Sequence, residues 1–140
     1  MKKVLIAGAT GAMGQKAVDL VNSLAGFEIT AALAPTLTKE NVADFHLASS
    51  VHPYQTLDEI EDGVADIWID FTLPSAVYQN VKFALEHEMR PIVGTTGLTD
   101  EQQADLVRLS EEKQVGGLIA ANFGMSAVLL MKFAQEAAKY

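Results

Sequence analysis

The feature that most constrains the fold is the glycine-rich segment 8–14 (GATGAMG), because it separates two stretches of different hydrophobic period. Residues 3–7 (KVLIA) form a compact apolar run rich in branched side chains, which is typical of a strand buried on both faces of a parallel sheet. After the glycines, apolar residues recur at helical spacing, at Met13, Ala17, Leu20 or Val21, and Leu24. A second apolar run at 27–33 (FEITAAL) completes a β-α-β unit.

The remainder of the chain repeats this alternation. We predict strands at 51–54, 65–71, 90–93 and 115–121. We predict a helix with Val77, Val81, Ala84 or Leu85, and Glu88 on one face, a helix that opens with a capping box at 99–102, and a last helix at 126–139. Alternating strands and helices predict an α/β fold, a doubly wound open parallel sheet of the Rossmann-like, dinucleotide-binding kind, with residues 1–140 as one domain.

Composition narrows the classes of function. The net charge of −8 supplies no basic stripe, so neither nucleic acid nor an anionic membrane is an expected partner. The chain has no cysteine, which excludes disulfides and thiolate metal sites. Its apolar runs are far shorter than the roughly 18 residues of a membrane span. We therefore expect a cytoplasmic globular protein, and we expect no metal because the carboxylates lack ligand spacing.

The glycine loop is the first candidate site. In doubly wound sheets ligands bind beyond the carboxyl ends of the strands, where this loop would lie. Glycines at Gly8, Gly11 and Gly14 allow a tight turn and close approach of the backbone to a pyrophosphate, while N–H groups at the helix N-terminus face the anion. A purely structural turn is the alternative. No Gly-Lys-Ser/Thr follows, which argues against a nucleotide-hydrolysing Walker loop.

Three more loops are expected at the same edge. Phe71 with Thr72 follows a strand and would border an adenine or ribose, although a core phenylalanine is an equal alternative. Residues 94–97 (GTTG) would present backbone N–H groups to a carboxylate or to the nicotinamide ribose, or would be an ordinary strand–helix loop. Residues 120–124 (AANFG) carry an asparagine amide suited to a carboxamide, or a turn-forming asparagine.

No catalytic residue is expected among these loops. The three histidines, His46, His52 and His87, are predicted in a loop, in a weak edge strand and on the outer half of a helix. A general acid or base must reach the reacting atoms, and none of these positions is at the ligand edge.

Taken in order and spacing, GATGAMG after KVLIA, DIWIDFTLP, PIVGTTGLT and IAANFG resemble the nucleotide-binding domain of the bacterial 4-hydroxy-tetrahydrodipicolinate reductase (dihydrodipicolinate reductase) family over essentially the whole chain. The resemblance implies reduction of a cyclic dicarboxylate, a lysine precursor, with NADH or NADPH in the route to diaminopimelate and lysine. It implies cofactor contacts from Gly8, Ala9, Thr10, Gly11, Ala12, Met13, Phe71, Thr72, Gly94, Thr95, Thr96, Ala120, Ala121, Asn122 and Phe123.

The chain also departs from the family. The family's paired-histidine motif with its lysine and its S-G-T-A loop belong to a second domain, so we expect an isolated N-terminal domain that binds cofactor and scarcely turns over. Homo-oligomers would form through the missing domain.

Cofactor preference is the second departure. Family members carry an acidic or basic residue at the end of the second strand, or a basic one inside the glycine loop, where this chain has Ala34, Pro35 and Ala12. Thr36, Thr38 and Lys39 lie nearby in sequence, so we expect weak discrimination with a lean to NADPH. The alternatives are another two-domain nicotinamide dehydrogenase and a non-catalytic dinucleotide sensor.

Overall fold

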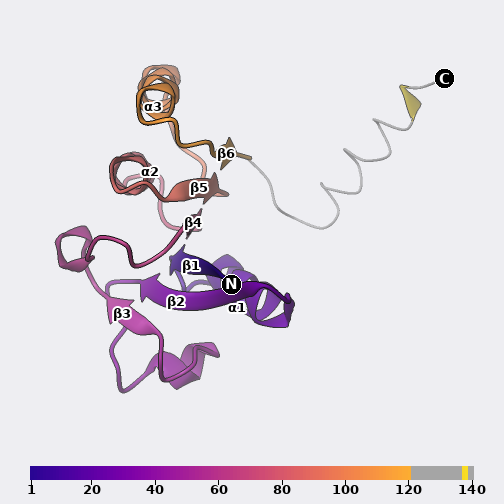
Figure 1. The fold of residues 1–140 in the computed structure, drawn as a ribbon, viewed down its shortest axis with the longest axis vertical. Helices are drawn as coiled ribbons and strands as arrows, with labels where there is room; N and C mark the ends of the chain where they lie inside the picture. Colours follow the sequence, from indigo (N-terminus) through magenta and orange to yellow (C-terminus); the bar gives the residue numbers. More distant parts are fainter. Residues whose placement is uncertain (121–136, 139–140) are drawn as a thin grey trace.

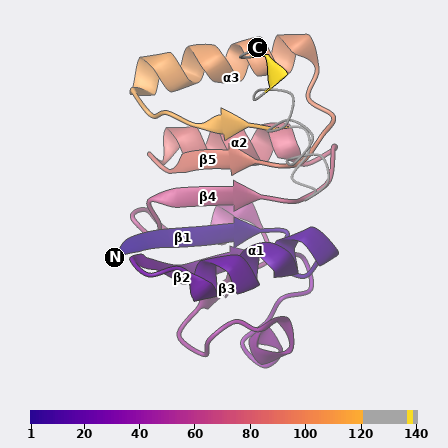
Figure 2. The same cartoon turned by 90° about the vertical axis from the view of Figure 1, so that its right-hand side faces the viewer.

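A computed structural model of the chain describes residues 1–120 and 137–138, and its centre is a six-stranded parallel sheet (Figure 1). The strands are β1 (Lys2–Ala7), β2 (Phe27–Leu33), β3 (His52–Tyr54), β4 (Ile67–Asp70), β5 (Arg90–Val93) and β6 (Leu118–Ile119). Their order is β3-β2-β1-β4-β5-β6, and every pairing is parallel. Figure 2 shows the strands side by side with their arrowheads at one edge. The predicted doubly wound, Rossmann-like sheet is confirmed.

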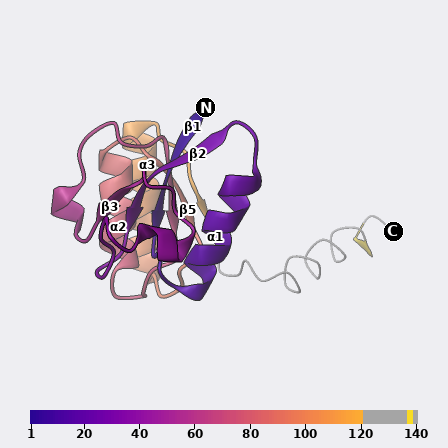
Figure 3. The ribbon, with the colours of Figure 1, turned by 90° about the horizontal axis from the view of Figure 1, so that it is seen from below.

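Helices cover both faces of this sheet. They are α1 (Ala12–Ser23), α2 (Val77–Glu86) and α3 (Asp100–Lys113), with 3-10 turns η1 (Val42–Phe45) and η2 (Leu57–Glu59). Helix α1 lies on one side, and α2 and α3 lie on the other (Figures 1 and 3). Strand β2 pairs with one edge of β1, and β4 pairs with the other edge. The direction in which successive strands are added to the sheet therefore reverses at β1. In the described part of the chain no helix is long and apolar enough to cross a membrane.

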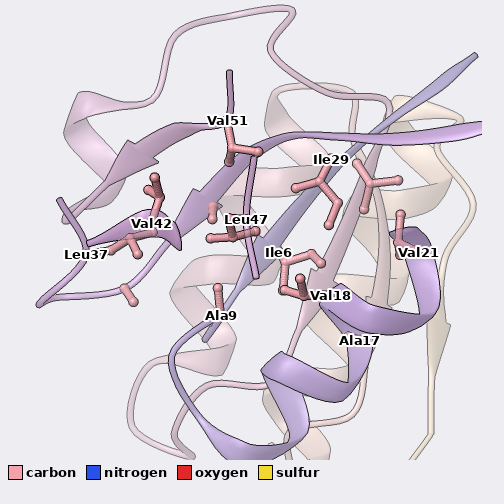
Figure 4. Close-up of a cluster of buried hydrophobic side chains, with 13 residues drawn as sticks. Ile6, Ala9, Ala17, Val18, Val21, Ile29, Leu37, Val42, Leu47 and Val51 are labelled. Carbon is pink, nitrogen blue, oxygen red and sulfur yellow. The ribbon is translucent and has the colours of Figure 1, made fainter. Parts of the chain in front are cut away.

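The alternation of side chains along β1 divides the core between the two faces. Val4 and Ile6 pack with α1 and with the loop region around η1, in the cluster drawn in Figure 4. Leu5 and Ala7 point the other way and pack in a second cluster with Trp68. A third cluster joins α2, α3 and β5. Every β1 residue from Val4 to Ala7 is almost fully buried, as the two-faced burial of a central parallel strand requires.

The predicted elements within the described residues are present, with corrected faces and ends. Helix α1 buries Gly14, Ala17, Val18 and Val21. Of the apolar residues that recur at helical spacing, Ala17 and Val21 are buried, whereas Met13, Leu20 and Leu24 have exposed fractions of 36%, 59% and 45%. Gly14, Ala17, Val18 and Val21 follow the i, i+3, i+4, i+7 spacing of a single helix face, and this is the face that packs on the sheet.

Helix α2 ends earlier than the apolar pattern suggested. Its last residue is Glu86, and Glu88 lies beyond it with a φ of 60°, so Glu88 does not extend the buried face. The capping box that opens α3 is confirmed by the reciprocal bonds of Thr99 and Gln102. Strands β4 and β6 are shorter than predicted. The predicted helix at 126–139 lies outside the described residues, apart from 137–138.

A polar cluster joins α2 to α3 on the surface. The Tyr78 hydroxyl donates to Asp105 Oδ2 at 2.5 Å, and Arg108 contacts Asp105 and Glu112 along α3. These bonds favour the charged carboxylate, so Tyr78 first and Arg108 second lower the pKa of Asp105 below its ordinary 3.8. The same hydrogen bond raises the pKa of Tyr78 above 10.0.

We expect Asp105→Asn to lower the melting temperature near neutral pH. Because the folded-state pKa of Asp105 is lowered, its contribution is complete above the ordinary value of 3.8 and is lost as the pH falls through the folded-state value. The difference in melting temperature between variant and parent should therefore vanish in acid. Thermal melts over a pH series measure it, with Glu112→Gln, which removes only the negative charge of one Arg108 partner, as the milder control. A difference that stays constant into acid would contradict the assignment.

Candidate functional site

A cleft of about 400 Å³ opens at the carboxyl ends of β1, β2 and β4. It lies where the strand order reverses about β1, the position at which doubly wound sheets bind ligands. Its lining residues come from the end of β2, from the segments that follow β1, β2, β3 and β4, and from α2, and they are Gly8, Thr10, Gly11, Leu33, Ala34, Pro35, Gln55, Thr56, Leu57, Phe71, Thr72, Leu73, Ala76 and Asn80. The glycine loop and the loop after β4, both predicted at this edge of the sheet, thus line one cleft.

Two of the three loop glycines are required by close backbone packing. Gly8 has a φ of +82°, and a Cβ there would lie 2.1 Å from the carbonyl oxygen of Phe71. A Cβ on Gly14 would lie 1.8 Å from the carbonyl oxygen of Gly8. Both distances are far inside van der Waals contact, so any larger residue would displace backbone. At these two positions the structural-turn alternative is sufficient.

Gly11 is different. Its φ of −79° suits any residue, and a Cβ would have the carbonyl oxygen of Gly8 as its nearest neighbour at an ordinary 3.5 Å. Gly11 is also the N-cap of α1, where no side chain caps the helix and no acidic residue stands in the first turn. A helix N-terminus of this kind presents unsatisfied N–H groups to an anion. Packing within the protein therefore does not require glycine at this position, whereas a ligand bound against the loop would require it.

The structure places the predicted site residues in three groups. Gly8, Thr10, Gly11, Phe71 and Thr72 line the cleft. Ala9 is buried in the core beside α1, and Ala12 with Met13 forms the exposed first turn of that helix. The predicted residues that follow β5 and β6 do not line this cleft; these are Gly94, Thr95, Thr96 and Ala120. Ala121, Asn122 and Phe123 lie outside the described residues.

The sequence did not predict the buried carboxylate of Asp70, which lies between Thr72 of the cleft lining and Thr95 of the loop after β5. Asp70, the last residue of β4, has an exposed fraction of 0%. Its Oδ2 accepts a hydrogen bond from the Trp68 indole at 3.0 Å, and its Oδ1 accepts from the Thr72 and Thr95 hydroxyls, both at 2.7 Å. Asn80 of α2 in turn donates to the Thr72 hydroxyl at 3.2 Å. The signal was present, because an aspartate inside an apolar strand must be buried with partners.

The loop after β3 is a second omission. Gln55, Thr56 and Leu57 line the cleft next to Ala34, whose N–H donates to the carbonyl oxygen of Tyr54 at 3.0 Å. The Gln55 amide donates to the carbonyl oxygen of Leu37 at 3.1 Å, and its backbone N–H donates to Glu59 Oε2 at 3.0 Å. Three residues of β3 are too few for a strong alternating pattern, so the sequence did not attach this loop to the site.

None of the lining residues has a titratable side chain. The hydroxyls and the cation expected near the end of β2 are not in the lining either, because Asn41 ties that loop to itself through the Thr38 N–H at 2.8 Å and the Thr36 carbonyl at 2.9 Å. The cleft therefore offers backbone N–H groups, neutral side chains and one aromatic ring. An anionic ligand would be held by main-chain donors and the α1 N-terminus.

No histidine lines the cleft: His52 lies in β3 as predicted and His46 in a loop, whereas His87 follows the end of α2 rather than lying on that helix. His46 contacts Asp19 at 2.9 Å, His87 contacts Asp62 at 2.5 Å, and the His52 ring stacks on Tyr54 with centroids 4.4 Å apart. Among the described residues no group of three or more histidine, cysteine or carboxylate side chains is arranged to hold a metal ion.

Known proteins are similar to this chain in sequence and in fold. Residues 2–123 match the family described as dihydrodipicolinate reductase, N-terminus. The 4-hydroxy-tetrahydrodipicolinate reductases of Lactobacillus helveticus and Lactobacillus acidophilus are 63% and 62% identical over 139 residues, which are 99% of this chain and 53% of each relative. A dipicolinate-bound dihydrodipicolinate reductase from Paenisporosarcina sp. TG-14 superposes with a TM-score of 0.82 at 33% identity, covering 100% of this chain and 54% of that one. The chain spans about half the length of the curated relatives it matches.

Proposed function

The chain belongs to the family described as the N-terminus of dihydrodipicolinate reductase, and we propose that its cleft binds NADH or NADPH for a reductase of that kind. The observation that carries the proposal is that the fold leaves room for a Cβ at Gly11, so packing within the protein does not explain why a glycine stands there. The pyrophosphate would lie against the backbone of residues 8–13 and the N-terminus of α1. When bound, the cofactor supplies a hydride.

We propose positions for the adenosine and nicotinamide halves of the cofactor from the order of the strands in the sheet. The adenosine would lie beside Ala34, Pro35 and the loop after β3, since the adenine ribose of a dinucleotide sits at the end of the second strand. The nicotinamide half would extend past Phe71 and Thr72 toward Gly94, Thr95 and Thr96, which follow β5. Ala120, Ala121, Asn122 and Phe123 belong to the same proposed end.

The whole reaction is also a proposal. Its substrate would be 4-hydroxy-tetrahydrodipicolinate, a cyclic dicarboxylate on the route to diaminopimelate and lysine, as the names of the similar proteins suggest. This chain would orient the cofactor, while residues outside these 140 would clamp the dicarboxylate, donate the proton and form a homo-oligomer. A cytoplasmic location fits a chain without cysteine.

Calorimetric titration with NADH and with NADPH tests the proposal. Weak heat at millimolar cofactor, accompanied by a rise in melting temperature, is expected. Absence of both signals for both cofactors would overturn the assignment of the cleft.

We expect the two cofactors to bind within about a hundredfold of one another, because no charged side chain lines the cleft near the proposed ribose position. Ala34 is 2% exposed and belongs to a core cluster, so a carboxylate is better introduced at its exposed neighbour Pro35, which also lines the cleft.

Pro35→Asp is expected to shift the ratio of dissociation constants toward NADH by about tenfold, because the new charge repels a 2′-phosphate and accepts from a 2′-hydroxyl. Titration of both cofactors measures the ratio. Pro35→Asn, which has the same shape without the charge, should leave the ratio within about twofold of the parent. An equal shift in the two variants would show that charge at this position does not select the cofactor.

A further inference from the structure

Asp70 ties together two loops that follow neighbouring strands. Thr72 belongs to the loop after β4 and lines the cleft, whereas Thr95 belongs to the loop after β5. Both hydroxyls donate to the same oxygen, Asp70 Oδ1, at 2.7 Å, and the Thr72 N–H donates to the Thr95 hydroxyl at 2.8 Å. The two loops are therefore joined both directly, through the Thr72 N–H and the Thr95 hydroxyl, and through the shared carboxylate of Asp70.

We propose that Asp70 is a positioning residue for the nicotinamide half of the cofactor, an inference that rests on the proposed function. Strand order supports the assignment of the half, since β2 and β1 would serve the adenosine and the pyrophosphate, and β4 and β5 come next along the edge. Asp70 does not line the cleft, so it acts through Thr72, which does, and through the loop that begins at Gly94.

Packing of the sheet does not explain why a carboxylate is buried at position 70. Asp70 pairs with Ala7 on one side and Val93 on the other, two apolar neighbours beside which an apolar side chain would pack. Burying a carboxylate is costly unless it is fully hydrogen-bonded. Here every bond that it accepts, from Trp68, Thr72 and Thr95, comes from β4 or the two loops. We therefore infer that the buried carboxylate holds those two loops in place.

Thr95 is the point at which the link can be cut. Its side chain is 8% exposed, and its hydroxyl is engaged by Asp70 Oδ1 and by the Thr72 N–H. Thr95→Val has a closely similar shape and removes both bonds, whereas Thr95→Ser retains the hydroxyl. Neither change touches the bond from the Trp68 indole to Oδ2. Trp68 is the sole tryptophan, so its emission reports whether the carboxylate stays in place.

The experiment compares NADH with ADP, which lacks the nicotinamide half, on the 140-residue chain and its variants. We expect Thr95→Val to weaken NADH binding by about tenfold and ADP binding by less than about twofold, with Thr95→Ser restoring NADH binding. Asp70→Asn should act in the same direction, because either orientation of its amide places a donor against a donor. The double variant Asp70→Asn with Thr95→Val should be no weaker than Asp70→Asn alone.

The outcomes separate this inference from the proposed function. Equal weakening of NADH and ADP by Thr95→Val, or no change in either, overturns the positioning role while the cleft assignment stands. A parent chain that binds neither ligand overturns the proposed function and this inference with it. If Asp70→Asn fails to fold, Thr95→Val with its serine rescue decides the matter alone, provided that melting temperature and Trp68 emission match the parent.

Discussion

Gly11→Val is expected to weaken NADH binding by at least about a hundredfold while the protein stays folded. The backbone at Gly11 has a φ of −79°, and apart from its chain neighbours an added Cβ would meet no atom closer than 3.5 Å, so we expect valine to cost the fold only the preference for glycine at an N-cap. Because Gly11 lines the cleft at the N-terminus of α1, the added atoms occupy the space proposed for the pyrophosphate. A hundredfold loss corresponds to about 2.7 kcal/mol, a modest cost for a steric conflict with a ligand.

Gly14→Ala is the matched control in the same loop. Its single added carbon would lie 1.8 Å from the carbonyl oxygen of Gly8, so we expect a loss of about 3 kcal/mol in the free energy of unfolding. Chemical denaturation measures stability and calorimetry measures binding for both variants. Gly11→Val that bound NADH like the parent, or that unfolded as readily as Gly14→Ala, would remove the reason for assigning this loop to a cofactor.

The local part of this site was predictable from the sequence. A buried strand, three glycines and a helix follow one another within about twenty residues, and such neighbours along the chain fix their own geometry. Strand alternation then predicted which loops share the carboxyl edge. Sequence did not separate the three glycines, because the distance from Gly14 to the carbonyl of Gly8, and from Gly8 to that of Phe71, exists only after folding.

The parts that escaped prediction depend on contacts between distant segments. Asp70 and Thr95 are joined across two strands, and Gln55 reaches the cleft only because β3 pairs with β2 at the sheet edge. Helical spacing alone also could not choose between Leu20 and Val21 on α1, since both are apolar and adjacent. The sheet selects Val21, which is 5% exposed, and leaves Leu20 in solvent.

The 140-residue chain on its own is expected to show no measurable reduction of 4-hydroxy-tetrahydrodipicolinate, although it binds cofactor. Reduction of an imine requires a proton source, and no residue that lines the cleft has a titratable side chain. His46 and His87 are paired with surface carboxylates, and His52 stacks on Tyr54. Holding a dicarboxylate in line with the cofactor also calls for cationic side chains or for donors other than those proposed to hold the pyrophosphate, and no cationic side chain lines the cleft.

The measurement is oxidation of NADH or NADPH with enzymatically generated substrate, with the Lactobacillus helveticus reductase, 63% identical over 139 residues, as positive control. A proton donor and a substrate clamp each contribute roughly a hundredfold or more, so turnover should fall below about 10⁻⁴ of the control. A hybrid in which this chain replaces the matching half of that relative should recover turnover to within about tenfold, because the matched half is the one proposed to hold the cofactor. Turnover by the chain alone within tenfold of the control would place the proton donor among these 140 residues and contradict the proposed division of roles.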